Sequence, residues 1–214
     1  MKINCDKVIT VDDFDADYVS WKGRSLTVMG DYIKVNQEGI QPRYFDTIYL
    51  FEEVGVLIGF KYGLPMNECY ITTLDGQESE CYVDAMPYLF ADCNHVYAVV
   101  KRSYRNTDLR KQVIGLGLID IATLTSLDPK FTWPIWEDIL SIHNGAILIK
   151  KNEESYGLAT LDKFPACNLA NNAFLITKEE GEENVYIVSK YNMGRKETQT
   201  CDFTKKLSKI KIVR

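Results

Sequence analysis

The feature that most constrains the fold of this chain is a β-hairpin pattern that occurs four times. In each copy, a short apolar run is followed by a polar turn and by a second apolar run that closes with lysine. The first copy, residues 48–61, has its turn at Glu52–Gly55, and the later copies cover residues 87–101, 139–151 and 174–190. Recurrence at intervals of about 40 to 50 residues is typical of repeat proteins, whose units pack against their neighbours. The pattern therefore predicts an all-β array of antiparallel hairpins.

The segments outside these hairpins also indicate strands. Residues 18–29 form a further hairpin pattern with Gly23 in its turn. The best helical candidate, residues 118–127, is rich in Thr and Ser and is flanked by Gly117 and Pro129, so we expect little helix. We divide the chain into an N-terminal capping β segment, three β repeats, and a fourth degenerate repeat with a C-terminal capping strand, which cover residues 1–40, 41–165 and 166–214.

Composition and charge narrow the class of protein. The 214 residues are 46% hydrophobic and 26% charged, which is ordinary for a globular protein. No run approaches the roughly 18 apolar residues of a membrane span, and acidic residues interrupt the N-terminal segment where a secretory signal would be apolar. The net charge is −5, but residues 101–111 and 203–214 are basic, so the rest is strongly acidic. We therefore expect a cytoplasmic protein that binds neither nucleic acid nor membranes and that suits a protein partner.

The cysteines do not have the spacing of a metal site. Six are present, and Cys69, Cys81 and Cys93 are evenly spaced. Zinc ligands usually come in pairs about two to four residues apart, and no Cys-x-x-Cys occurs in the chain. We therefore expect free thiols, no structural metal and no cofactor.

Several short motifs resemble those of the WG-repeat proteins, a family of bacterial β-repeat proteins. The matching segments lie roughly between residues 40 and 165: Pro42–Ile48, Tyr82–Met86, Pro134–Ile139, Lys61–Gly63, Gly117–Asp120, Tyr156–Leu158 and Leu161–Asp162. Tyr62 and Tyr156 stand in place of the tryptophan that precedes glycine in the family, and no Trp-Gly dipeptide occurs. The resemblance implies an array of repeats arranged as an open sheet, a solenoid or a partial propeller. It also implies a binding module, with no shared catalytic residues to carry over.

The chain offers few candidates for catalysis. Cys93 and His95 lie in the same predicted turn, yet no third group that would orient the histidine is visible in the sequence. Pairs of carboxylates such as Glu52 and Glu53 fall in predicted turns, where solvated charge is usual. We therefore assign no catalytic residue.

These observations favour a non-catalytic protein-binding module, for instance a bacterial or phage inhibitor or an immunity-type protein that occludes its partner. One alternative is a small-ligand or glycan-binding protein that uses exposed aromatic side chains. Another is a hydrolase that uses turn carboxylates or Cys93 with His95.

The predicted partner site is a basic insertion, residues 102–112, which we interpret as a loop and for which the first hairpin has no counterpart. Tyrosine beside arginine is a combination enriched at protein-binding hot spots. We therefore expect Arg102, Tyr104, Arg105 and Arg110 to contact an acidic patch on a protein. Other tyrosines near turns are further candidates for exposure: Tyr44, Tyr62, Tyr156 and Tyr191.

Overall fold

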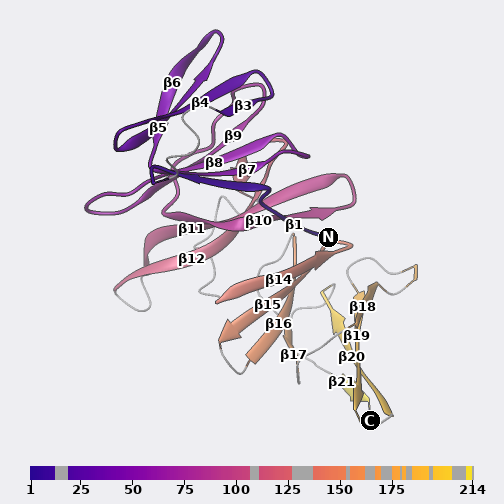
Figure 1. Ribbon diagram of the computed structural model, residues 1–214. Coiled ribbons are helices and arrows are strands. Elements are labelled where there is room, and N and C mark those ends of the chain that lie inside the picture. Colours follow the sequence, from indigo (N-terminus) through magenta and orange to yellow (C-terminus); the bar gives the residue numbers. More distant parts are fainter. Residues whose placement is uncertain are drawn as a thin grey trace.

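The computed structural model shows an all-β protein, as predicted (Figure 1). It describes residues 1–12, 19–106, 111–126, 137–152, 155–161, 167–169, 175–178, 180–181, 185–192, 195–203 and 211–213. These ranges contain 21 strands, arranged in five antiparallel sheets, and no helix. It follows that they contain no helix that could cross a membrane.

We number the sheets I to V in the order in which they follow one another through the molecule (Figure 1). Sheet I contains β3 (Val19–Trp21), β4 (Arg24–Met29), β5 (Tyr32–Gln37) and β6 (Ile40–Phe45). Sheet II contains β2 (Lys7–Thr10), β7 (Thr47–Phe51), β8 (Val56–Lys61) and β9 (Glu68–Thr73). Sheet III contains β1 (Lys2–Asn4), β10 (Asp84–Asp92), β11 (His95–Asn106), β12 (Lys111–Asp120) and β13 (Thr125–Ser126).

The last two sheets are formed by the C-terminal part of the chain. Sheet IV contains β14 (Asp138–His143), β15 (Ala146–Asn152), β16 (Ser155–Thr160) and β17 (Cys167–Leu169). Sheet V contains β18 (Leu175–Lys178), β19 (Val185–Asn192), β20 (Arg195–Asp202) and β21 (Lys211–Val213). The four hairpins expected from the sequence are the pairs β7–β8, β10–β11, β14–β15 and β18–β19.

The first two strands do not stay with the sheet that follows them in sequence. β1 pairs with β10 in sheet III, and β2 pairs with β7 in sheet II. The chain therefore passes through sheets III and II before it forms sheet I, and then returns to complete both. Residues 1–40, which we expected to act together as one cap, thus supply strands to three sheets. Of these three sheets, only sheet I lies at an end of the stack, and sheet V lies at the other end.

A hydrophobic core lies between each successive pair of sheets. β8 shows how a strand contributes to two of them: Val56 and Ile58 pack toward sheet III, whereas Leu57 packs toward sheet I. Successive side chains of a strand point to opposite faces, so a strand between two sheets must be apolar at every position. This is why the hairpin strands read as continuous apolar runs.

One backbone hydrogen bond recurs in the three middle sheets and aligns them. Asp46 N donates to Phe60 O at 2.7 Å, Val83 N to Lys101 O at 2.8 Å, and Glu137 N to Lys150 O at 2.9 Å. The residues that follow these acceptors are Lys61, Arg102 and Lys151. Lys101 is therefore structurally equivalent to Phe60 and Lys150, and Arg102 is equivalent to Lys61 and Lys151. The sequence pattern had treated Lys61, Lys101 and Lys151 as equivalent.

Candidate functional site

The predicted partner-binding residues lie on a two-stranded ribbon. β10 pairs with β11 only up to Lys101, whereas β11 continues to pair with β12 from Arg102 to Asn106. This pair extends beyond β10 at one side of sheet III (Figure 1). The described part of the insertion, residues 102–106 and 111–112, is therefore strand, although the sequence suggested a loop. Its polar residues suit a ribbon that has solvent around it.

The structure places the four predicted residues unequally. Arg102 is about half exposed, and its Nη1 lies 3.3 Å from Glu80 Oε1, in an exposed ion pair that is worth little. Tyr104 and Arg105 belong to β11, opposite Val113 and Gln112. Arg110 lies outside the described residues, as do the side chains of Tyr104 and Arg105.

A second candidate surface lies where sheet I meets sheet II. We call Tyr32 and Tyr44 the tyrosine rim; they are 38% and 44% exposed. Tyr62 is 55% exposed, but its ring stacks on Phe60 with centroids 6.4 Å apart, and Phe60 packs into the core between sheets II and III. Tyr62 therefore lies on the other face of sheet II and is not part of the rim. The rings of Tyr32 and Tyr44 meet edge to face, with centroids 5.1 Å apart and planes at 86°. Tyr32 and Tyr44 line one open hollow of about 440 Å³ together with Phe45, Asp46 and Lys61. Large aromatic surfaces of this kind are usual at binding sites.

Local structure explains why Tyr32 and Tyr44 face outward. Gly30, with φ of 63°, reverses the chain before Tyr32, which is the first residue of β5. In β5 and β6, Ile33 and Phe45 pack into the core between sheets I and II. Their neighbours Tyr32 and Tyr44 must then point to the opposite face, because side chains alternate along a strand.

Asp46 and Lys61 line the hollow, and each contacts a neighbouring strand or aromatic ring. The Asp46 carboxylate accepts a hydrogen bond from Tyr62 N at 2.5 Å, which joins the end of β8 to the β6–β7 connection. The ammonium group of Lys61 lies 6.0 Å from the ring centre of Phe45 and 5.6 Å from that of Tyr70. A lysine at this distance from aromatic rings makes a cation–π contact. The hollow thus combines aromatic rings with one acidic and one basic group.

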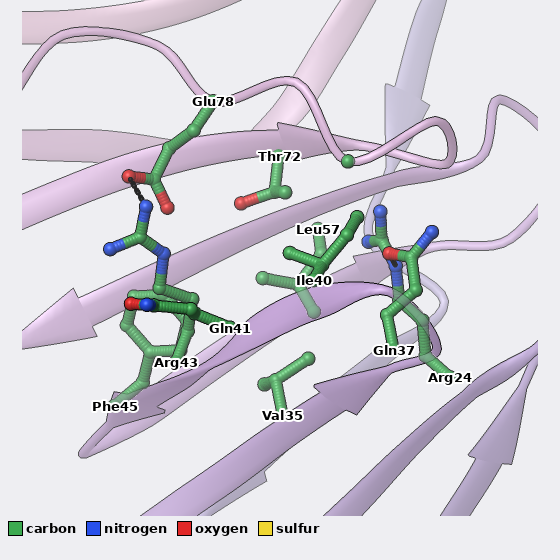
Figure 2. Close-up of a pocket in the computed structure, with 11 residues that line it drawn as sticks. Arg24, Val35, Gln37, Ile40, Gln41, Arg43, Phe45, Leu57, Thr72 and Glu78 are labelled. Carbon is green, nitrogen blue, oxygen red and sulfur yellow. Dashed lines mark hydrogen bonds and ion pairs between the residues drawn. The ribbon is translucent and has the colours of Figure 1, made fainter.

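A small pocket also lies between sheets I and II, on another part of their interface (Figure 2). Figure 2 shows the guanidinium groups of Arg24 and Arg43 at its two ends, with Val35, Ile40 and Leu57 between them. Its volume is about 40 Å³, which is room for roughly three water molecules and not for a cofactor. Arg43 pairs with Glu78 at 2.9 Å. We therefore regard the pocket as part of the sheet interface.

Arg24 supports this structural interpretation. Only 2% of the residue is exposed, and burial lowers the pKa of its guanidinium group, although the charge of Asp75 opposes the change. Its Nε donates to Gln37 Oε1 at 2.8 Å, and its Nη2 donates to Thr73 O in sheet II. Among the described residues, Arg24 Nη1 and Trp21 Nε1 are buried without a hydrogen-bond partner. Arg24 therefore joins the two sheets at the cost of one unsatisfied donor.

The turn of the second hairpin contains a feature that the sequence analysis missed. Asp120 Oδ2 lies 2.9 Å from His95 Nδ1, and Asp120 is largely buried. Asp120 thus orients the histidine of the proposed Cys93–His95 pair. Cys93 is exposed and has φ of 53°, but it forms no hydrogen bond with His95. The structure brings a base and its orienting group together, and it leaves the nucleophile separate from them.

No group of three or more His, Cys, Asp or Glu in the described residues could hold a metal ion. Five cysteines are free thiols: Cys5, Cys69, Cys81, Cys93 and Cys201. Tyr156 is partly buried against the core between sheets IV and V, and the side chain of Tyr191 lies outside the described residues.

Comparison of the chain with protein-family models, with curated proteins and with solved structures found no match. Sequence reasoning identified Tyr44 and Tyr62 as candidates for exposure and missed Tyr32. The exposure of Tyr32 could have been predicted from the Gly30–Asp31 turn, because Tyr32 directly follows this turn as the first residue of a strand. No local signal linked Asp120 to His95, because they are paired through neighbouring strands.

Proposed function

We propose that this protein is a non-catalytic protein-binding module, built as an open array of hairpin repeats of the WG-repeat type. The observation that carries the proposal is the tyrosine rim. Tyr32 and Tyr44 are exposed side by side near one end of the sheet stack, whereas Tyr88, Tyr97 and Tyr186 are buried in its cores. Tyrosine contributes a large rigid contact area and loses little conformational entropy on binding, so exposed clusters of it favour association.

The neighbourhood of the rim supports a protein as the ligand. Met29 is the cross-strand partner of Tyr32 and is 44% exposed, which adds a flexible apolar side chain to the rings. Methionine and tyrosine are both enriched in protein interfaces. An inhibitor or an immunity-type protein would use such a surface to cover the active surface of its partner.

The β11–β12 ribbon is a second contact surface for the same function. It extends past β10, and Gln112 and Ile114 on its β12 strand are exposed, although Val113 between them is buried. Arg102, Tyr104, Arg105 and Arg110 would then meet an acidic patch on the partner, with arginine forming paired hydrogen bonds to carboxylates.

Alanine substitution tests the proposal once a partner has been isolated by affinity capture. Tyr44→Ala should weaken binding by about 2 kcal/mol or more in calorimetry, and Tyr44→Phe should weaken it less. Leu175→Ala is a matched control, because Leu175 is 51% exposed but lies in sheet V. If Tyr44→Ala binds as tightly as Leu175→Ala, the tyrosine rim is not the site.

A hydrolase is a second candidate, and one observation favours it: the 2.9 Å contact between Asp120 and His95. An oriented histidine can act as a general base for a nearby thiol. In this case His95→Ala and Asp120→Asn should both slow the alkylation of Cys93 by iodoacetamide near neutral pH. Equal alkylation rates in these variants and the unmodified protein would remove the candidate.

A further inference from the structure

The strand beside the tyrosine rim is poorly suited to extend its sheet. β6 is the outer strand of sheet I, and its residues from Ile40 to Tyr44 are exposed. Pro42 lies in the middle of this strand and has no N–H to donate to an incoming strand. The β5–β6 ladder also shifts register between Val35 and Gln37. Proline and an irregular register both discourage edge pairing, so a partner segment must be recognised by side chains.

The tyrosine rim provides side-chain recognition of a particular kind. The perpendicular rings of Tyr32 and Tyr44 form two aromatic walls beside an open hollow of about 440 Å³. Tyr32 and Tyr44 also carry phenolic hydroxyls, which can donate hydrogen bonds to backbone carbonyls. Segments in the polyproline II conformation make no internal hydrogen bonds, and they dock in grooves lined by aromatic residues.

The charges at the hollow favour an uncharged segment. Asp46 and Lys61 contribute one charge of each sign, so the hollow has no net charge from the residues that line it. One oxygen of Asp46 is already used by Tyr62 N. A strongly acidic peptide would be attracted by Lys61 and repelled by Asp46, and a strongly basic peptide the reverse.

We propose that the tyrosine rim binds a proline-rich segment of the partner in the polyproline II conformation. This inference rests on the proposed protein-binding function and names the class of peptide that the rim accepts. The bound segment packs its proline rings against the exposed faces of the Tyr32 and Tyr44 rings, and its carbonyl groups accept hydrogen bonds from the tyrosine hydroxyls.

The test uses the full chain and a blocked oligoproline peptide of about ten residues, long enough for several polyproline II turns. Amide chemical shifts should change at residues of the rim on addition of the peptide, and a Gly-Ser peptide of equal length should cause no change. Tyr32→Ala and Tyr44→Ala should each weaken binding at least about tenfold. Tyr44→Phe, which keeps the ring, should retain most of the affinity. Leu175→Ala should bind like the unmodified protein.

Three outcomes would overturn the inference. The first is no change at the rim at millimolar oligoproline, in protein whose circular dichroism and melting temperature show that it is folded. The second is binding that Tyr32→Ala and Tyr44→Ala do not weaken. The third is a response of the rim to neutral methyl pyranosides and not to oligoproline, which would favour the glycan-binding alternative.

If oligoproline does not bind while Tyr44→Ala still weakens binding of the isolated partner, the peptide class is wrong and the protein-binding function stands. If Tyr44→Ala affects neither ligand, both fail.

Discussion

β8 and β5 occupy neighbouring sheets, yet their sequences follow different rules. In β8 the residues from Val56 to Phe60 are all buried, whereas in β5 buried and less buried positions alternate. Sheet II has a neighbour on both faces, and sheet I has a neighbour on only one. The same hairpin architecture therefore needs a continuous apolar run in the middle of the stack and an alternating pattern at its end.

This difference also determines where aromatic side chains can be exposed to a binding partner. Tyr97 is 4% exposed because it lies in the core between sheets III and IV, and Tyr44 is 44% exposed because it lies on the uncovered side of sheet I. The end of a stack of sheets is therefore where large aromatic residues can serve a partner without weakening a core. Four substitutions test the comparison, in decreasing order of expected effect.

Removing buried volume from the middle of the stack should have the largest effect. Ile58 is fully buried in β8, so Ile58→Ala should lower the free energy of unfolding by about 2–5 kcal/mol. Thr27→Ala in β4 of sheet I is the control, since Thr27 alternates with the core residue Leu26, and a change within about 0.5 kcal/mol is expected. Urea denaturation measures both, and equal losses would contradict the distinction between middle and end sheets.

Arg24 tests whether the interface of the end sheet depends on a buried polar clamp. Arg24→Met leaves Gln37 Oε1 without its donor and removes one of the two donors to Thr73 O, which keeps its bond from Gly76 N, so a loss of about 1–3 kcal/mol is expected. Arg43→Met removes only the partly exposed ion pair with Glu78 and should cost about 1 kcal/mol or less. A smaller loss for Arg24→Met than for Arg43→Met in thermal unfolding would show that Arg24 is not a clamp.

Gly59 tests how closely sheets I and II approach each other. A Cβ at this position would lie 2.5 Å from Phe45 Cδ1, so Gly59→Ala should destabilise the protein by about 1–3 kcal/mol. At Gly63 a Cβ would meet nothing within 4 Å, which makes Gly63→Ala the matched control. Combining Gly59→Ala with Phe45→Leu should recover part of the loss in a double-mutant cycle, and strict additivity of the two changes would argue against the contact.

Tyr88 should make a small contribution to the free energy of unfolding, and this contribution should depend on pH. Burial raises its pKa, and the hydrogen bond that its hydroxyl donates to Asp138 Oδ1 at 2.6 Å acts in the same direction. The tyrosine then ionises more readily in the unfolded chain, where its pKa is about 10. Its contribution is therefore present below about pH 10 and is lost as the pH rises further.

Melting temperatures measured across this alkaline range check the expectation. Tyr88→Phe should lower the stability near neutral pH by about 1 kcal/mol, because a hydrogen bond is lost, and should make the alkaline decline shallower. An unchanged alkaline slope in Tyr88→Phe would contradict the role assigned to this residue.

Much of the fold was predictable from the sequence, and the site was predictable in part. The four hairpins and the turn at Gly23 occur where the sequence placed them. Tyr44 and Tyr62 are exposed, as their position near turns indicated. The interpretation of residues 102–112 as a loop was wrong for the described part. The polar composition there reflects strands without a covering sheet, and composition does not distinguish an exposed ribbon from a loop.

The sequence by itself determined the strands and their tight turns, because alternation and turn residues act over a few neighbouring positions. Asn144 and Gly145, for example, have φ of 49° and 79°, as a two-residue hairpin turn requires. Only the tertiary structure decided that β1 and β2 join sheets III and II, that Asp120 orients His95, and that Tyr32 meets Tyr44. Each of these depends on which strands pair or pack across the chain. Any exposed strand edge offers the same backbone groups, so local sequence does not select the partner.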